Sequence, residues 1–269
     1  MTAIPNDQTP DPAQPELVLS ERLDGVLRLT LNHPEKRNTF SVEMLTALKE
    51  RLAEAEQDKA VRALIIAANG PVFSSGHNIK EFVGAEEERA REIIDLSSEL
   101  MLGLRRLPKP VIAQVAGLAT AAGCQLVAIC DLVVASREAR FQTPGVMIGL
   151  FCSTPMVPLS RAIPSKKTME MLLTGEPISA EEAERLGLVN RVVSPEKLEE
   201  ETLALARKII SFSGFTIGLG KKAFYEQLPL DLPAAFKIGK AAMVRNVVAQ
   251  DGQEGMSAFL EKRPPEWSD

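Results

Sequence analysis

The segment from Lys109 to Ser136 places the strongest constraint on how this chain can fold. A mostly apolar run, Val111 to Val115, leads into a tract of small residues, 116–123, and then into a helix-like stretch, Cys124 to Cys130. A strand, a small-residue turn and a helix N-terminus together aim backbone N–H groups at a negative charge, and small side chains let a ligand approach the backbone. The segment therefore predicts a site that stabilises an oxyanion.

The composition argues against several classes of function. The net charge of −5 and the aromatic content of 4% disfavour a nucleic-acid partner, which needs basic patches and stacking side chains. Three cysteines without CxxC spacing and two histidines disfavour a disulfide framework and a zinc site. No apolar run approaches the roughly 20 residues of a membrane span. We therefore expect no nucleic-acid partner, no membrane partner and no bound metal.

The N-terminal stretch MTAIPNDQTPDPAQPE carries four prolines and three acidic residues but no lysine or arginine. This composition predicts a disordered tail over 1–15. A signal peptide needs a basic segment followed by an apolar one, and a transit peptide is rich in arginine. Neither pattern is present, so we expect a cytoplasmic location.

Strand and helix patterns alternate along most of the chain. Ser41 can cap one helix, and Ser179 with Glu182 forms a capping box on another. The apolar face of the first helix consists of Val42, Leu45, Leu48, Leu52 and Ala55. Further patterns predict strands at 17–19, 25–31, 63–67, 111–115, 131–135 and 189–193, and helices at 86–106, 122–130, 166–173 and 195–211.

After residue 211 only helices follow, at 215–227, 232–249 and 254–262. Repeated strand–helix alternation followed by helices predicts an α/β fold with a helical C-terminal subdomain. We expect a core over 16–211 and a C-terminal helical region over 212–269.

Several motifs then carry a resemblance to a known family. They are HPEKRNTFS (33–41), FSSGHNIKEF (73–82), the 109–136 segment, FQTPGVMIGL (141–150), LLTGEPISAEEAERLGLVNRVV (172–193) and GMSAFLEKR (255–263). From about Leu17 to the C-terminus, the chain resembles the crotonase superfamily, the enoyl-CoA hydratase/isomerase family. The resemblance implies a spiral of ββα units with two roughly perpendicular sheets. It also implies that the C-terminal helices assemble the chain into a homotrimer, often paired into a homohexamer.

The resemblance also implies a ligand, an acyl-CoA thioester, with no separate cofactor and a setting in fatty-acid metabolism. In the family, two backbone N–H groups form an oxyanion hole for the thioester oxygen, and these match His77 and Ala122. The other positions that match residues around the CoA or the acyl group are Lys36, Arg37, Ser75, Gly76, Asn78, Ile79, Ala121, Gly123, Cys152, Met243 and Lys262.

The chain departs from the family at the positions of its acid and base. Hydratases of the family use two glutamates, in the motifs GGGCEL and QPE, and the matching residues here are Gln125 and Gly145. Glutamine does not exchange protons near neutral pH, and glycine has no side chain. Each positioned acid or base contributes about 10²–10⁴ to the reaction rate, so losing both should slow hydration strongly. The backbone N–H donors of an oxyanion hole do not depend on these two side chains. We therefore expect thioester binding without efficient hydration by the usual route.

Several side chains keep two interpretations. The His77 ring either acts as an acid or base, or only fills space beside its own N–H. Cys152 is either a nucleophile or a packing residue. Gln125 either binds substrate or water, or is a satisfied polar residue on a helix. Ser153, Thr154 and Thr143 either orient a water or a polar acyl group, or are turn residues.

Two classes of function remain open for the whole chain. The first is an enzyme on CoA thioesters, such as a specialised hydratase, an isomerase, or another enolate-forming lyase or hydrolase. The second is a non-catalytic acyl-CoA-binding or assembly protein. Function is decided by the site and not by the fold.

Overall fold

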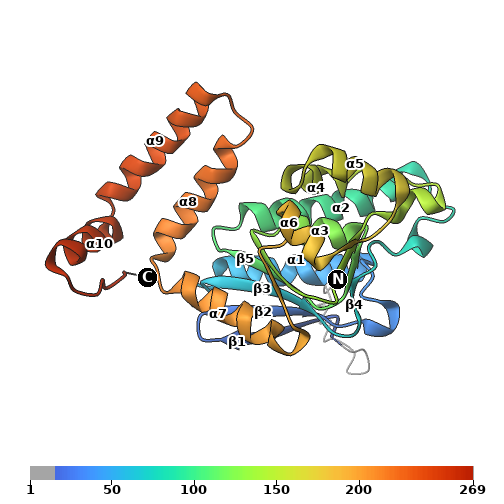
Figure 1. The fold of residues 1–269 in the computed structure, drawn as a ribbon, viewed down its shortest axis with the longest axis horizontal. Coiled ribbons are helices and arrows are strands. Elements are labelled where there is room, and N and C mark those ends of the chain that lie inside the picture. Colours follow the sequence, from blue (N-terminus) through green and yellow to red (C-terminus); the bar gives the residue numbers. More distant parts are fainter. Residues whose placement is uncertain (1–15, 269) are drawn as a thin grey trace, which may run out of the picture.

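The computed structural model describes residues 16–268, and the predicted tail, 1–15, lies outside the described residues (Figure 1). One sheet has six strands in the order β1-β2-β3-β5-β7-β10. Their bounds are β1 Val18–Leu23, β2 Val26–Leu31, β3 Ala63–Ala68, β5 Val111–Val115, β7 Leu132–Ser136 and β10 Arg191–Val193. β1 pairs antiparallel with β2, and the other pairs are parallel. The parallel strands are covered on both faces, which explains the apolar run of β3.

A second sheet has four short strands in the order β4-β6-β8-β9. Their bounds are β4 Val72–Ser74, β6 Leu118–Thr120, β8 Arg140–Gln142 and β9 Ile178–Ser179. The prediction of a continuous turn over 116–121 was therefore wrong, because β6 lies inside that tract. A strand of three residues is too short to produce a visible alternation in sequence.

Seven helices surround the sheets. Their bounds are α1 Val42–Gln57, α2 Glu87–Arg106, α3 Ala122–Ile129, α4 Met156–Ala162, α5 Ser165–Thr174, α6 Ala180–Leu186 and α7 Leu198–Ile210. Both predicted N-caps form, since Ser41 Oγ accepts from Met44 N–H at 3.2 Å and Ser179 Oγ from Glu182 N–H at 3.1 Å. The reciprocal half of the predicted capping box is not seen, because the Glu182 carboxylate lies 2.8 Å from Lys167 Nζ instead. α1, α2 and α3 pack on one face of the six-stranded sheet, and α7 covers the other (Figure 1).

Details of the helices differ from the sequence prediction. In α1 Met44 is buried and Val42 is only half-buried, so the apolar face is rotated slightly. Residues Pro195–Lys197 form a 3₁₀ turn, η4, ahead of α7. Three further 3₁₀ turns are η1 Pro34–Lys36, η2 Ile79–Glu81 and η3 Pro144–Ile148. The short helix α4 had no prediction, because it contains Pro158 and has little apolar periodicity.

Three C-terminal helices stand away from the core as an arm (Figure 1). They are α8 Gly214–Gln227, α9 Leu232–Val248 and α10 Gln250–Glu261. α9 buries none of its 17 residues within this chain. No single helix of the described chain is long and apolar enough to cross a membrane, although the bent pair Pro195–Ile210 and Gly214–Gln227 reaches that length and composition together.

A buried ion pair fixes the arm to the core. Lys221 Nζ lies 2.7 Å from Asp131 Oδ2 and also donates to the carbonyl oxygens of Leu104 and Lys109, at 3.0 and 2.9 Å. The Tyr225 hydroxyl donates to the other carboxylate oxygen of Asp131 at 2.7 Å. The side chains of Lys221 and Asp131 are only 7% and 15% exposed. The attachment of α8 therefore depends on a carboxylate that follows α3.

Candidate functional site

One free backbone N–H group lies at the start of α3. Ala121 precedes the helix with φ 51° and ψ −119°, a conformation that turns the chain sharply from β6 into α3. The Ala121 N–H donates to Gln142 O at 2.9 Å, and the Ala121 carbonyl accepts from Gln125 N–H at 3.0 Å. The Ala122 N–H has no hydrogen-bond partner among residues 16–268. It is one of the N–H groups that a helix N-terminus leaves for a ligand.

A second free N–H group lies in the loop after β4. Ser75 N–H donates to Arg37 O at 3.0 Å, Gly76 N–H to Ser74 Oγ at 3.2 Å, and Asn78 N–H to Phe40 O at 3.2 Å. Between them, the N–H of His77 has no partner within the described chain. The loop thus satisfies the N–H groups on both sides of His77 and leaves that one available.

Glycines bring these two N–H groups to the same wall. A Cβ added at Gly76, where φ is +82°, would lie 2.9 Å from Ala121 Cβ and 3.0 Å from Ala122 N. A Cβ added at Gly123 would lie 2.4 Å from Ser74 O. Only glycine permits this close approach of the loop to the helix start. The N–H groups of His77 and Ala122 therefore belong to neighbouring segments that line one cavity.

The cavity has a volume of about 580 Å³. Its lining is Ser75, His77, Ile79, Phe82, Ile94, Ala121, Ala122, Pro144, Gly145, Met147, Ile148, Leu150, Phe151, Cys152, Ser153, Thr154 and Pro155. No aspartate, glutamate, lysine or arginine is among these described lining residues. Several apolar side chains of the rim, including Met147 and Ile148, are more than half exposed. The cavity is therefore an apolar, uncharged chamber with hydrogen-bond donors in one wall.

The structure brings together about half of the predicted site residues. Those that line the cavity are Ser75, His77, Ile79, Ala121, Ala122, Gly145 and Cys152. Others lie behind its wall or elsewhere: Gly76, Asn78, Gly123 and Gln125 near it, Lys36 and Arg37 in the exposed turn η1, and Met243 and Lys262 on the arm. The Asn78 side chain is engaged within its own turn, with Lys80 N–H and Glu81. The lining residues that the sequence did not predict include Phe82, Ile94 and the apolar stretch around Met147, although the periodicity of α2 could have indicated Ile94.

Gln125 does not line the cavity. It is 4% exposed on α3, and its Oε1 atom is buried without a hydrogen-bond partner among the described residues. The Oγ1 atoms of Thr120 and Thr143 are buried in the same unpartnered way. Gln125 is therefore not a satisfied helix residue, because its Oε1 lacks a partner among the described residues. Its amide does not reach the cavity either, because the residue lies outside the lining.

Gly145 lies in a wall too crowded for a side chain. A Cβ there would lie 2.6 Å from Leu150 O and 2.9 Å from Cys152 Sγ. The Leu150 N–H donates to Gly145 O at 2.9 Å, and this bond holds the loop after η3 against η3. A glutamate substituted at position 145 would therefore displace backbone.

His77 is the one histidine in the described lining, which contains no lysine or arginine. Its ring packs edge-on against Phe82 at 5.7 Å, and its Nε2 atom is buried without a described partner. Burial lowers the pKa of His77 from 6.5 to about 4. The imidazole is therefore neutral at physiological pH, which favours the space-filling interpretation of the ring over a proton-transfer role.

The thiols of the site region are protonated. Burial raises the pKa of Cys152, with an opposing contribution from a hydrogen bond to the backbone of Gly145. Burial also raises the pKa of Cys124 to about 12. Because the thiolate is the nucleophile, these shifts favour the packing interpretation of Cys152.

Ala121→Gly should raise the free energy of unfolding by about 1 kcal/mol. Ala121 has a positive φ of 51°, where a non-glycine residue stores about 1–3 kcal/mol of strain, while glycine costs about 0.4–1 kcal/mol through the unfolded chain. Urea unfolding measures the change. The control is Ala122→Gly, one residue further and inside the helix, which should lose up to about 1 kcal/mol. Equal losses in the two variants would contradict the strain at Ala121.

Folding stability should fall as pH drops from about 6.5 to about 4 because of His77. In that window the unfolded chain binds a proton at this residue and the folded chain does not, so the contribution is complete above the unfolded pKa and is lost on acidification. The shift corresponds to about 3 kcal/mol. Urea unfolding across this range should show a weaker dependence in His77→Gln. The control His33→Gln should retain it, and an unchanged dependence in His77→Gln would contradict the account.

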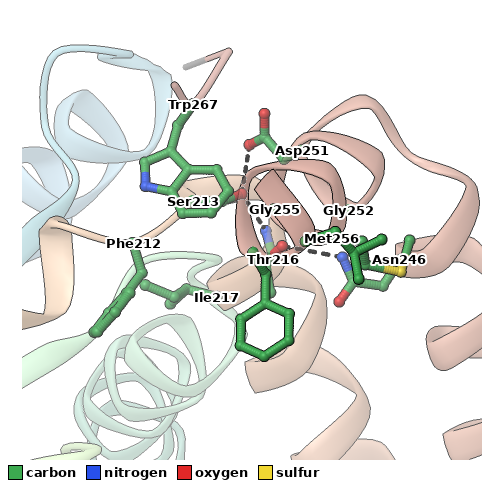
Figure 2. A pocket seen from close by; sticks show the side chains of 12 residues that line it. Phe212, Ser213, Thr216, Ile217, Asn246, Asp251, Gly252, Gly255, Met256 and Trp267 are labelled. Carbon is green, nitrogen blue, oxygen red and sulfur yellow. Dashed lines mark hydrogen bonds between the residues drawn. The ribbon is translucent and has the colours of Figure 1, made fainter. Parts of the chain in front are cut away.

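A second cavity of about 790 Å³ lies on the arm, between α8, α10 and the chain end (Figure 2). Ser213 Oγ donates to Asp251 at 2.5 Å, and Asn246 Nδ2 donates to Thr216 Oγ1 at 3.0 Å. Much of the remaining wall is apolar, as at Trp267. None of the predicted site residues lines it.

Across the part of the chain that the structure describes, no group of three His, Cys, Asp or Glu side chains could hold a metal ion.

Comparisons with known proteins give the chain its relatives. Residues 21–269 match the family model described as enoyl-CoA hydratase/isomerase. Enoyl-CoA hydratase domain-containing protein 3, mitochondrial, from Rattus norvegicus is 49% identical over 257 residues, which cover 95% of this chain and 86% of the rat protein.

Solved structures agree with the sequence match. The crystal structure of an enoyl-CoA hydratase from Mycobacterium smegmatis has a TM-score of 0.92 at 46% identity, covering 95% of this chain and all (100%) of that one. The crystal structure of human enoyl-CoA hydratase domain-containing protein 3 has a TM-score of 0.89 at 49% identity, covering 93% and 100%. This chain therefore has the crotonase fold and belongs to the enoyl-CoA hydratase/isomerase family.

Proposed function

We propose that the protein binds acyl-CoA thioesters and holds the thioester oxygen between the N–H groups of His77 and Ala122. The observation that carries the proposal is the pair of unpartnered N–H groups in one wall of the cavity. Preorganised donors of this kind stabilise the charge that develops on a carbonyl oxygen. The apolar remainder of the cavity then holds the acyl group.

The CoA moiety would extend from this wall towards η1. Lys36 and Arg37 are exposed there and form no ion pair with another described residue. Arg37 O accepts from Ser75 N–H at 3.0 Å, so this cationic turn is one hydrogen bond from the cavity lining. We propose that the two cations contact CoA phosphates and that Ser75 and Ile79 line the path between them. Met243 and Lys262 would reach the nucleotide from the arm in an assembly.

The chemistry that follows binding differs from two-glutamate hydration. The described lining offers no carboxylate, and its imidazole is neutral because burial keeps the pKa of His77 near 4. We propose thioester binding with enolate stabilisation, as in an isomerase or lyase that uses another proton-transfer group. The same lack of an acid and a base favours a second candidate, an acyl-CoA-binding or assembly protein without turnover.

The protein should bind butyryl-CoA at least about 100-fold more tightly than succinyl-CoA. The two acyl groups are similar in length, but succinyl carries a carboxylate into a chamber whose described lining has no cation. Burying an unpaired carboxylate costs several kcal/mol, and each 1.4 kcal/mol is about tenfold in affinity. Calorimetric titration with both thioesters, and with CoA as the reference for the nucleotide part, measures the ratio. Equal affinities for all three ligands would contradict acyl binding in this cavity.

We propose that the arm assembles the chain into a homotrimer or homohexamer. Apolar side chains on it are widely exposed, with Phe259 82% and Phe236 69% exposed. Exposed apolar surface of this extent is typical of protein interfaces. Light scattering of the purified protein tests the proposal, and a monomeric mass at micromolar concentration would contradict it.

The cellular compartment has two candidates. The rat relative carries "mitochondrial" in its name, which conflicts with the expected cytoplasmic location. A fluorescent fusion of the whole chain, viewed in cells, distinguishes a diffuse from an organellar distribution.

A further inference from the structure

We propose that Asn38 is a positioning residue, whose hydrogen bonds fix the N–H of His77 for the thioester oxygen. The inference rests on the proposed function, since it concerns the same pair of donors. Asn38 is fully buried at 0% exposure and adopts φ +49°. Asparagine tolerates this left-handed conformation better than most residues. It lies in the turn that follows η1, outside the cavity lining.

The Asn38 side chain uses its acceptor and both of its donor hydrogens. Its Oδ1 accepts from His33 N–H at 2.8 Å. Its Nδ2 donates to Asn69 O at 2.9 Å and to Val72 O at 2.8 Å. The amide therefore ties the η1 turn to the residues that enter β4. Because an asparagine amide offers one acceptor and two donor hydrogens, no other small side chain supplies this set.

The Asn38 backbone continues the connection to the far end of β4. Its carbonyl oxygen accepts from Ser74 Oγ at 2.8 Å, and the same Oγ accepts from Gly76 N–H at 3.2 Å. Gly76 directly precedes His77 and packs against the start of α3. Asn38 and Ser74 thus fix the peptide groups that lead into His77, and so the direction of its free N–H.

Asn38 also connects the two protein segments that would bind the two ends of the ligand. Arg37, adjacent to Asn38, is one of the cations proposed for the CoA phosphates, and its carbonyl accepts from Ser75 N–H at 3.0 Å. One buried amide therefore sets the cationic turn and the oxyanion donor in a common frame. Loss of the amide should affect the carbonyl contact most, since hydrogen bonding to a carbonyl depends steeply on angle and distance.

Isotope-edited infrared spectroscopy of bound butyryl-CoA, labelled with ¹³C at the carbonyl carbon, tests the inference. Hydrogen bonds from His77 and Ala122 should lower the C=O stretching frequency of the wild-type complex below that of the free ligand. In Asn38→Gly, which permits the positive φ, and in Ser74→Ala, at least half of this lowering should be lost. Affinity for CoA without an acyl group should stay within about threefold in Ser74→Ala, because that variant leaves the Asn38 amide in place.

The matched control is Asn190→Ala. Asn190 also uses its side chain to hold a backbone N–H, that of Val133 at 2.7 Å, but lies away from the cavity lining. It should keep the wild-type carbonyl frequency even if it is less stable. A wild-type lowering that persists in both Asn38→Gly and Ser74→Ala would overturn the positioning role alone. If Asn38→Gly does not fold, Ser74→Ala decides by itself. A free-ligand frequency in the wild type would overturn the proposed function, and the positioning role with it.

Discussion

Lys221→Met should lower the free energy of unfolding by about 3–5 kcal/mol, because it leaves a buried carboxylate without its cation. The Lys221 side chain is 7% exposed, and its Nζ lies 2.7 Å from Asp131 Oδ2. It also satisfies two backbone carbonyls, those of Leu104 and Lys109. The loss should detach α8 from the core before the sheets unfold, since α8 is the first helix of the arm. Urea unfolding and light scattering measure the stability and the assembly.

The neighbouring lysine supplies the control. Lys222 is 68% exposed and lies 3.8 Å from Glu226, so Lys222→Met should cost less than about 0.5 kcal/mol. Tyr225→Phe, which removes one hydrogen bond to Asp131, should cost about 1 kcal/mol. A paired Asp131→Leu and Lys221→Met variant should recover part of the loss, because no buried charge remains. If Lys221→Met were as mild as Lys222→Met, the ion pair would not hold the arm.

Gly145→Ala should lower the free energy of unfolding by about 1–3 kcal/mol through overpacking alone. The added methyl would lie 2.6 Å from a backbone oxygen, that of Leu150, which cannot move aside as a flexible side chain could. Gly103→Ala is the control: it lies inside α2 with nothing within 4 Å of an added Cβ, and should gain up to about 1 kcal/mol. Similar effects of the two substitutions in urea unfolding would contradict the crowding.

Gly145→Glu should cost more than Gly145→Ala and should not create a hydratase. The carboxylate could enter the cavity only after the loop around Leu150 and Cys152 had moved, and that movement would alter the lining itself. Hydration of crotonyl-CoA by this variant should stay at the wild-type level. A rise of about 10² or more, the usual contribution of one acid or base, would mean that the loop adapts readily.

Much of the fold could be predicted because its signals are local. Residues close together in the sequence determine the caps at Ser41 and Ser179, the apolar run of β5 and the three helices of the arm. The strands β6 and β9 could not be predicted, since two or three residues show no periodicity and pair only through tertiary contacts. The short helix α4 could not be predicted either, because it contains Pro158 and has little apolar periodicity.

The site was predictable in part, and the division has a physical cause. The small-residue tract indicated an oxyanion site at the start of a helix, and the family resemblance indicated the N–H groups of His77 and Ala122. The crowding at Gly145 depends on Leu150 and Cys152 folding back over it, which no local pattern encodes. The network of Asn38 likewise joins residues up to 36 positions apart, and is visible only in three dimensions.

Crotonyl-CoA hydration and acyl-CoA binding, measured on one sample of the whole protein, show whether the site binds a thioester without two-glutamate hydration. Hydration is followed by the loss of enoyl-thioester absorbance, beside a family member that carries both glutamates. We predict that the thioester binds more tightly than CoA alone, while hydration is slower than in that relative by at least about 10²–10⁴. Hydration at the relative's rate would contradict the account, because another group would then supply the acid and base. Failure to bind any thioester would contradict the oxyanion hole itself.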